Sequence, residues 1–446
     1  MPPTHCSAFT ICPLLSSVKT AYLTGFSDCA MISAKKMIYE TKGVYIMLLL
    51  RKIYCRAFQE VFHMAIPFLP YRKPALLHHT DALVPLFQKK GISCILLVTD
   101  PVVRGNLITQ PLEKALQQAG IGCIVYDQTV SNPTTDQVEE ARALYNAHHC
   151  QAIIGFGGGS SIDCAKAVGA RIARPRKTLD KMEGILQVWK KIPLLIAIPT
   201  TAGTGSETTL AAVITDSRTR HKYPINDFVL IPRYAVLDPE VTRGLPPAVT
   251  ATTGMDALTH AVEAFIGGST TKETRHDAIS AVKLIFTYLP KAYADGNDMN
   301  ARRHMLHAAY FAGNAFSKSY VGYVHAVAHS LGGRYNTPHG LANAVLLPYV
   351  LQAYGRHAYR KLHRLAVAIG ISDPMESHRA GAEKFIQAVR DLQDNLDIPR
   401  KLSEIRAEDI PSLAKKADHE ANPLYPVPKL MNAKELQRFY YDIMED

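Results

Sequence analysis

The sequence predicts an α/β domain with a parallel sheet, followed by a domain built only of helices. Between about residues 94 and 238, short apolar runs typical of buried strands alternate with longer helical segments. Strands separated by helices of ten or more residues pair in parallel through right-handed crossovers. After Pro239 the strand-like runs stop and helical patterns follow almost throughout. The chain of 446 residues also exceeds the comfortable size of one core, so two domains are expected.

Residues 1–46 mix Cys, Ser, Lys and scattered apolar residues without sustained periodicity. We expect a poorly ordered extension, or sequence upstream of a start at Met47. No Arg precedes Arg51, whereas mitochondrial transit peptides are rich in Arg. The charged start and single apolar block of a secretory signal are not in place either.

The next segment has the spacing of an amphipathic helix from about residue 50 to 65, stopped by Pro67 and Pro70. We expect its apolar face to pack on its own protein, and membrane contact is the less favoured alternative. The apolar positions at helical spacing are Leu50, Ile53, Tyr54, Ala57, Phe58, Val61, Phe62 and Ala65.

The alternating part and the helical part each follow from local patterns. Strands are predicted at 94–100, 122–130, 151–157, 194–200, 211–216 and 234–239, with helices at 107–120, 134–149 and after the glycines at 157–159. Beyond residue 241 the predicted helices are 247–266, 274–293, 298–316, 322–333, 340–354, 356–369, 375–396 and 433–444.

Composition excludes several classes of function. The formal net charge is +11, but residues 1–80 hold nine Lys or Arg and three acidic residues, so the excess lies at one end. No basic stripe with interleaved aromatic residues appears, which argues against nucleic-acid binding. All eight Cys lie before residue 165 without a CxxC pair, as in a reducing compartment, so a cytoplasmic location is expected. No uninterrupted apolar run is long enough to cross a membrane.

Three histidines and one aspartate have the spacing of a metal site. Asp256 and His260 share one helix face at i,i+4 in GMDALTHAVEAF. His325 and His329 repeat that spacing in YVHAVAHSLGG, and His339 follows at a Pro-His-Gly turn. Neutral imidazole together with carboxylate suits Fe(II) or Zn(II), whereas calcium and magnesium prefer more oxygen ligands. Ordinary surface or core histidines are the alternative, which two i,i+4 pairs make less plausible.

Two small-residue loops follow predicted strands and are candidates for phosphate binding. GFGGGSSID (155–163) joins a strand to a helix, whose N-terminal N–H groups suit a phosphate. It matches neither GxGxxG nor a P-loop, and tight strand–helix packing also favours glycine. PTTAGTGSE (199–207) follows the next strand, and both loops would face one crevice at the carboxyl ends of the strands. The candidate residues here are Gly157, Gly158, Gly159, Ser160, Asp163, Thr200, Thr201, Thr204 and Ser206.

Asp100 ends the first strong strand and has two interpretations. A carboxylate at this place accepts from a ribose 2′-hydroxyl and repels a 2′-phosphate, which favours NAD(H) over NADP(H). It is about equally suited to cap a helix that starts at Pro101.

These blocks resemble, in order, those of the iron-containing (group III) alcohol dehydrogenase family over roughly residues 75–446. The matching motifs are GGGSSID, PTTAGTGSE, GMDALTHAVEAF and HAVAHSLGGRYNTPHGLANAVLLPYV. The resemblance implies a dehydroquinate-synthase-like fold with the active site between its two domains. Together with the residue patterns above, it gives an extension (1–46), an amphipathic helix and Pro-rich linker (47–74), an α/β dinucleotide-binding domain (75–240) and an all-helical metal and substrate domain (241–446).

The resemblance also implies roles for individual residues. The metal ligands would be Asp256, His260, His325 and His339, and His329 would be the catalytic histidine near substrate and nicotinamide. Asn132 and Lys222 match further cofactor-contacting positions. The implied reaction is the NAD(H)-dependent interconversion of alcohols with aldehydes or ketones. Fe(II), or alternatively Zn(II), would activate the substrate oxygen. The resemblance also implies a homo-oligomer, with a dimer expected.

Three other classes of protein are alternatives. A zinc glycerol dehydrogenase or a dehydroquinate synthase shares the fold, but the complete ligand pattern favours the iron group. A membrane-associated, non-catalytic binding protein would dock through the helix at 50–65, and the intact ligand set argues against it. A serine hydrolase is excluded because no G-x-S-x-G motif occurs.

Overall fold

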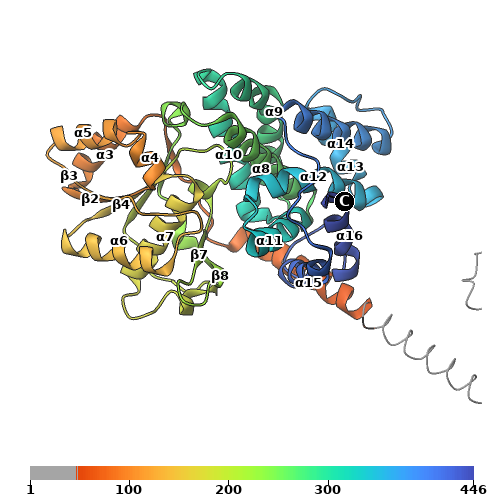
Figure 1. Cartoon of the computed structure of the whole chain (residues 1–446), viewed down its shortest axis with the longest axis horizontal. Coiled ribbons are helices and arrows are strands. Elements are labelled where there is room, and N and C mark those ends of the chain that lie inside the picture. Colours follow the sequence, from red (N-terminus) through yellow and green to blue (C-terminus); the bar gives the residue numbers. More distant parts are fainter. Residues whose placement is uncertain (1–46, 48, 446) are drawn as a thin grey trace, which may run out of the picture. The chain divides into compact units, whose positions relative to one another are not determined.

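The computed structural model describes Met47 and residues 49–445. The predicted fold class is confirmed: a parallel sheet comes first and helices follow (Figure 1). The expected extension at 1–46 lies outside the described residues. None of the described helices is long and apolar enough to cross a membrane.

The main sheet has six strands, and all the described pairings in it are parallel. Its order is β1-β9-β6-β4-β2-β3. The strands are β1 (Ala75–Leu77), β2 (Cys94–Val98), β3 (Gly122–Tyr126), β4 (Ala152–Gly157), β6 (Leu194–Pro199) and β9 (Tyr234–Val236).

Helices cover both faces of this sheet, which explains why its central strands are apolar without alternation. Leu96 of β2 packs in a core with α6 (Thr135–Ala147) and α7 (Gly159–Ala173). Its neighbour Leu97 packs in a second core with α3 (Leu83–Lys90) and α5 (Gln110–Gln118), on the opposite side in Figure 1. Helices therefore hold the sheet on both faces, which fixes the position of the loops at the carboxyl ends of its strands.

A second, three-stranded sheet has the order β5-β8-β7. Its strands are β5 (Gly184–Ile185), β7 (Ala211–Thr215) and β8 (Lys222–Asn226). Strands β1, β5 and β8 were not predicted, because the first two are very short and β8 contains a proline and begins with a lysine.

The predicted helices beyond residue 241 are all present, with ends shifted by a few residues. They are α8 (Pro247–Ile266), α9 (Lys272–Ala294), α10 (Met299–Ser319), α11 (Tyr323–Tyr335), α12 (His339–Tyr354), α13 (Tyr359–Ala368), α14 (His378–Asn395) and α16 (Ala433–Ile443). Helix α15 (Ile410–Ala421) was missed, because its apolar positions are interrupted by the polar run KKADHE. Helix α8 is buried nearly all round, packed among α9, α10 and α12.

The predicted N-terminal helix is present over residues 49–65, and Phe62 of its apolar stripe packs edge-on against Tyr320, but the buried face is shifted from the expected one. Phe58 and Val61 belong to the apolar stripe and are exposed, whereas Gln59 is buried. Gln59 Nε2 donates to the carbonyl oxygens of Tyr425 (2.7 Å) and Pro423 (3.1 Å). The amide satisfies two backbone acceptors that an apolar side chain would leave unpaired, so the buried face is rotated around the helix.

Candidate metal centre and cofactor loops

The structure brings Asp256, His260, His325 and His339 into one cluster, in which each offers a donor atom within 4.8 Å of the others. Asp256 and His260 lie one turn apart on α8, His325 lies on α11, and His339 opens α12. Three helices thus converge on one point.

The spacing of these atoms fits a divalent metal. Asp256 Oδ1 lies 3.4 Å from His339 Nε2 and 3.8 Å from His325 Nε2, and Asp256 Oδ2 lies 3.9 Å from His260 Nδ1. Four donors held about 2.1 Å from one ion in tetrahedral geometry are about 3.4 Å apart. His260 Nδ1 is buried without a hydrogen-bond partner, as suits a nitrogen that binds a metal. The donor set is that of Fe(II) or Zn(II).

Burial keeps the three imidazoles neutral, which is the form that binds metals. It lowers the pKa of His325 well below the ordinary value, and it lowers the pKa of His339 to about 4. The pKa of His260 is lowered for the same reason. The His260 ring is stacked between Phe316 (4.0 Å between centroids) and His325 (4.4 Å), so its orientation is fixed by packing.

Glu263, one turn after His260, holds His325 from behind. Its Oε2 accepts from His325 Nδ1 at 2.7 Å and from the backbone N–H of Gly322 at 2.8 Å, and its Oε1 accepts from Val324 N–H at 2.8 Å. His325 therefore carries its proton on Nδ1 and presents Nε2 to the cluster. Burial raises the pKa of Glu263 to about 7. Glu263 was not among the predicted site residues, although an acidic residue in a largely buried helix was a usable signal.

Asn343 was also missed. It lies one turn after His339 on α12 and is fully buried. Its Nδ2 donates to Asp256 Oδ1 at 2.7 Å and lies 3.0 Å from His339 Nε2. The amide thus fixes the orientation of the carboxylate.

The predicted catalytic histidine, His329, lies beside the cluster on the turn of α11 after His325. Its ring stacks on that of His339, with 5.1 Å between centroids and 19° between planes. His329 Nδ1 is 2.6 Å from Glu420 Oε1. Burial works against protonation of His329, but the charge of Glu420 outweighs it and raises the pKa. Glu420, on the unpredicted helix α15, was not among the predicted site residues.

The glycine loop joins β4 to α7 with a backbone that requires glycine at one position. Gly157 has φ of 155°, and a Cβ there would lie 2.4 Å from Ser161 Oγ. Gly158 is the N-cap of α7 and Gly159 its first residue, so the free N–H groups of this helix face the carboxyl edge of the sheet. Ser160 follows in the first turn.

The threonine loop follows β6, the neighbour of β4, and the two loops touch. Thr200 N–H donates to Gly157 O at 3.0 Å, and a Cβ on Gly159 would lie 3.0 Å from Thr204 Cγ2. Thr201 lies near Gly158. The structure thus places both predicted loops at one edge, as parallel pairing of their strands requires.

Asp100 follows β2, on the other side of β4. One of its carboxylate oxygens caps α4 (Pro101–Gly105) through the N–H groups of Val102 and Val103. The other accepts from Ser161 Oγ at 3.1 Å. Asp100 therefore does cap a helix and also lies beside the glycine loop.

The remaining predicted cofactor residues divide into two places. Lys222 Nζ, on β8, donates to Asn132 Oδ1 at 2.5 Å, and Asn132 N–H donates to Ser160 Oγ at 3.3 Å, so this pair borders the glycine loop. Asp163 lies beneath the loops, where it accepts from Ser206 Oγ (2.6 Å) and from a backbone N–H. We interpret Asp163 and Ser206 as supports of the two loops.

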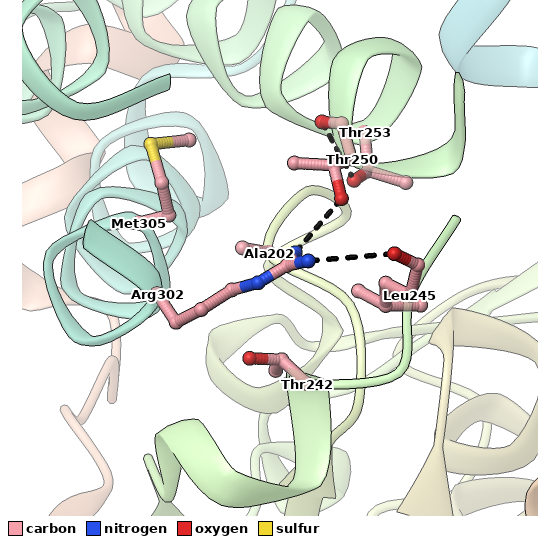
Figure 2. A pocket seen from close by; sticks show the side chains of 7 residues that line it. All are labelled: Ala202, Thr242, Leu245, Thr250, Thr253, Arg302 and Met305. Atoms are coloured by element: carbon pink, nitrogen blue, oxygen red, sulfur yellow. Dashed lines mark hydrogen bonds between the residues drawn. The ribbon is translucent and has the colours of Figure 1, made fainter. Parts of the chain in front are cut away.

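The threonine loop also packs on the metal-site helices. A Cβ on Gly203 would lie 2.7 Å from the Cβ and carbonyl oxygen of Thr253 on α8. Behind the loop, a small pocket contains the buried Arg302 of α10, which donates to Thr250 Oγ1 at 2.8 Å and to Leu245 O at 3.4 Å (Figure 2). The side chains that line this pocket belong to Ala202, Thr242, Leu245, Thr250, Thr253, Arg302 and Met305.

Helix α8 thus supplies two of the metal-ligand candidates and supports a loop at the edge where parallel sheets bind nucleotides. A candidate metal cluster beside a sheet edge of the nucleotide-binding type is the arrangement of a metal-dependent dehydrogenase.

More particularly, the chain belongs to the iron-containing alcohol dehydrogenase family. Residues 77–239 match the family described as iron-containing alcohol dehydrogenase, and residues 250–444 match the C-terminal part of the Fe-containing alcohol dehydrogenase family. The resemblance predicted from the motifs is confirmed, and the chain is an oxidoreductase that acts on CH–OH groups.

The similar proteins and solved structures agree with this family assignment. The chain is 37% identical over 329 residues to the NAD-dependent methanol dehydrogenase of Bacillus methanolicus, covering 73% of this chain and 86% of the relative. It is 39% identical over 340 residues to alcohol dehydrogenase 4 of Saccharomyces cerevisiae, covering 75% and 87%. The crystal structure of 1,3-propanediol oxidoreductase superposes with a TM-score of 0.80 at 34% identity, covering 83% of this chain and 98% of that one.

Proposed function

We propose that this chain is a cytoplasmic, homodimeric, NAD(H)-linked alcohol dehydrogenase for small primary alcohols and their aldehydes. We assign metal binding to Asp256, His260, His325 and His339. The single observation that carries this assignment is the convergence of their four donor atoms within 4.8 Å, in a neutral, buried setting. The domain division at about residue 240 is part of the proposal, with the sheet serving the nucleotide and the helices serving metal and substrate.

The substrate class rests on named relatives. One is a methanol dehydrogenase, and another, at 36% identity, is the 1,3-propanediol dehydrogenase of Citrobacter freundii. Both substrates are small primary alcohols. The cytoplasmic location rests on the thiols, since Cys94, Cys123, Cys150 and Cys164 form no disulfide.

The groups that are bound would contribute familiar chemistry. A divalent metal in this site supplies Lewis-acid polarisation of the substrate oxygen, and the nicotinamide ring supplies the hydride acceptor or donor. We prefer Fe(II) because of the family, and Zn(II) is the alternative that a glycerol dehydrogenase type would use.

The chain's own residues position these groups and move a proton. The N–H groups at the start of α7 would bind the pyrophosphate, with Thr200, Thr201 and Thr204 contributing hydroxyls from the second loop. Asn132 and Lys222 would contact the cofactor from the border of the glycine loop. We assign the exchange of a proton with the substrate hydroxyl to His329, which is half-exposed and stacks beside His339.

The test combines metal analysis with turnover. Protein loaded anaerobically with Fe(II) should oxidise NADH with short aldehydes, and protein loaded with Zn(II) should be slower. His260→Ala and His325→Ala should lose metal and activity together, whereas His357→Ala, at an exposed position on the short helix after α12, should keep both. Full metal content and normal turnover in either ligand variant would refute the assignment. Light scattering of the purified protein tests the dimer.

A further inference from the structure

We propose that Glu420 is a positioning residue for His329, and that Tyr425 positions Glu420 in turn. This inference rests on the proposed function of His329 as the proton-transferring group, and it adds two residues from a part of the chain in which the sequence showed no functional motif.

The three side chains form one hydrogen-bonded series. His329 Nδ1 lies 2.6 Å from Glu420 Oε1, and Tyr425 Oη donates to the same oxygen at 2.7 Å. His329 belongs to α11, Glu420 to the last turn of α15, and Tyr425 to the segment that follows α15. A carboxylate that accepts at Nδ1 holds the imidazole proton there and leaves the Nε2 lone pair available.

Packing fixes the direction of the ring. His329 stacks on His339 at 5.1 Å and lies edge-on to His325 at 5.9 Å between centroids. With one face on a metal-ligand candidate and Nδ1 held by Glu420, only Nε2 is left to meet a substrate hydroxyl. The arrangement matches the general pattern in which a carboxylate orients a histidine that acts as general base.

Protons and electrons balance in the proposed reaction. In alcohol oxidation His329 Nε2 would accept the hydroxyl proton, and a bound NAD⁺ would accept the hydride, with its electron pair, from the carbinol carbon. The products are the carbonyl compound, NADH and an imidazolium, whose charge lies beside the carboxylate of Glu420. His329 then releases its proton to water, and aldehyde reduction runs these steps in reverse.

The segment that carries Tyr425 is anchored from several distant parts of the chain. Gln59 Nε2 donates to the backbone carbonyl of Tyr425 at 2.7 Å, and the ring of Tyr425 lies 6.5 Å from that of Tyr320. Tyr320 has φ of 60° and ψ of −179°, a conformation that residues with a side chain rarely adopt. Its ring meets Phe62 edge-on at 5.1 Å. These contacts hold the segment in place, as the hydrogen bonds from Tyr425 to Glu420 and from Glu420 to His329 require if they are to keep one geometry.

The competing explanation is an ordinary ion pair at a half-exposed place, which would contribute little. The two explanations differ in what the charge does. If Glu420 only holds the local structure, its replacement alters stability or metal content. If it orients and balances His329, its replacement lowers turnover while metal content and the KM for NAD⁺ stay unchanged.

The experiment is a double-mutant cycle on the Fe(II)-loaded full chain, with the most active alcohol of a short primary series and NAD⁺. Glu420→Gln keeps an oxygen that accepts from both His329 and Tyr425 but removes the charge, and Glu420→Leu removes both. Glu420→Asp restores the charge on a shorter side chain. Glu408→Gln, at an exposed site just before α15, makes the same change of charge and serves as the matched control.

We expect His329→Ala to lower kcat by about 10²- to 10⁴-fold and Glu420→Gln by about 10- to 100-fold. Glu420→Leu should cost more, Glu420→Asp less, and Tyr425→Phe a smaller factor. In the His329→Ala background Glu420→Gln should have no further effect, because it acts only through His329.

The outcomes separate the two proposals. Full activity of His329→Ala would overturn the proposed role of that histidine. A strong loss in His329→Ala with wild-type turnover in Glu420→Gln would overturn the role of Glu420 alone. Additive effects in the double variant, or loss of metal from Glu420→Gln, would show that Glu420 supports the structure and does not position His329.

Discussion

His325 Nδ1 and Glu263 Oε2 are 2.7 Å apart, and both side chains are buried. The carboxylate also accepts two backbone N–H groups from the turn that starts α11, so it fixes at once the ring, its proton and the helix that carries it. Such a partner of a metal-binding histidine orients the ring and makes it a better metal ligand.

We therefore expect Glu263→Gln to weaken metal binding by about 10- to 100-fold, although no ligand is changed. The amide brings an NH₂ group to a place where three N–H donors already converge, so one donor loses its acceptor. Metal content after dialysis against graded chelator measures the effect, and Glu408→Gln provides the control. Retention of metal equal to the wild type would contradict the orienting role.

A second prediction separates the two roles of Asp100. Asp100→Asn keeps an oxygen that can cap α4 but removes the charge, so NADPH use should improve relative to NADH by on the order of tenfold. Asp100→Gly should improve it as well but should also lower the melting temperature, because the cap is lost. Ratios of kcat/KM for the two cofactors give the answer. An unchanged ratio in both variants would leave Asp100 with its capping role only.

A third prediction concerns Glu207, whose pKa burial raises to about 7. Its Oε1 is buried without a hydrogen-bond partner. The folded protein thus keeps a proton that the unfolded chain releases above about pH 4.5, so the stabilisation is full below that pH and is lost as pH rises through about 7. Burial lowers the pKa of its neighbour Lys166 to about 8, so the titration of Lys166 affects stability at higher pH than that of Glu207.

Glu207→Gln removes this titration. Relative to the wild type, the variant should therefore gain melting temperature as pH rises from about 5 to about 8, with a change on the order of 1–3 kcal/mol in unfolding free energy. Thermal unfolding at several pH values checks it. A difference between variant and wild type that is constant with pH would exclude Glu207 as a titrating group in this range.

A fourth prediction concerns the contact of the threonine loop with α8. Gly203→Ala forces a Cβ to within 2.7 Å of the Thr253 carbonyl oxygen, and backbone cannot yield as a flexible side chain can. We expect a loss of about 1–3 kcal/mol in stability and a raised KM for NADH, since the loop must move. Gly244→Ala, where a Cβ meets nothing within 4 Å, should change neither. A KM equal to that of the wild type would mean that the loop tolerates displacement.

The sequence was sufficient to predict the cluster of metal-ligand candidates because each member has a local signature. Asp256 with His260 and His325 with His329 repeat one helical spacing, and His339 follows a proline at a helix start. The two loops were predictable for a similar reason, since each follows an apolar strand. The contact between Glu420 and His329 was not predicted, because the two residues are 91 positions apart in the sequence and no local pattern encodes the contact. The rotated face of the helix at 49–65 likewise depends on acceptors hundreds of residues away.

The close packing of glycines between the threonine loop and the metal-site helices has a consequence for recombining members of this family. Gly203 meets Thr253 of α8, and the Cα of Gly313 on α10 lies 2.7 Å from where a Cβ on Gly205 would be. Consider a chimaera that joins the sheet of one relative to the helices of another at the boundary near residue 240. It would take the glycines of the loop and the residues they pack against from different proteins, although their sizes must match. The transferable module is the loop with the first half of α8 and the middle of α10, and grafts should carry all three.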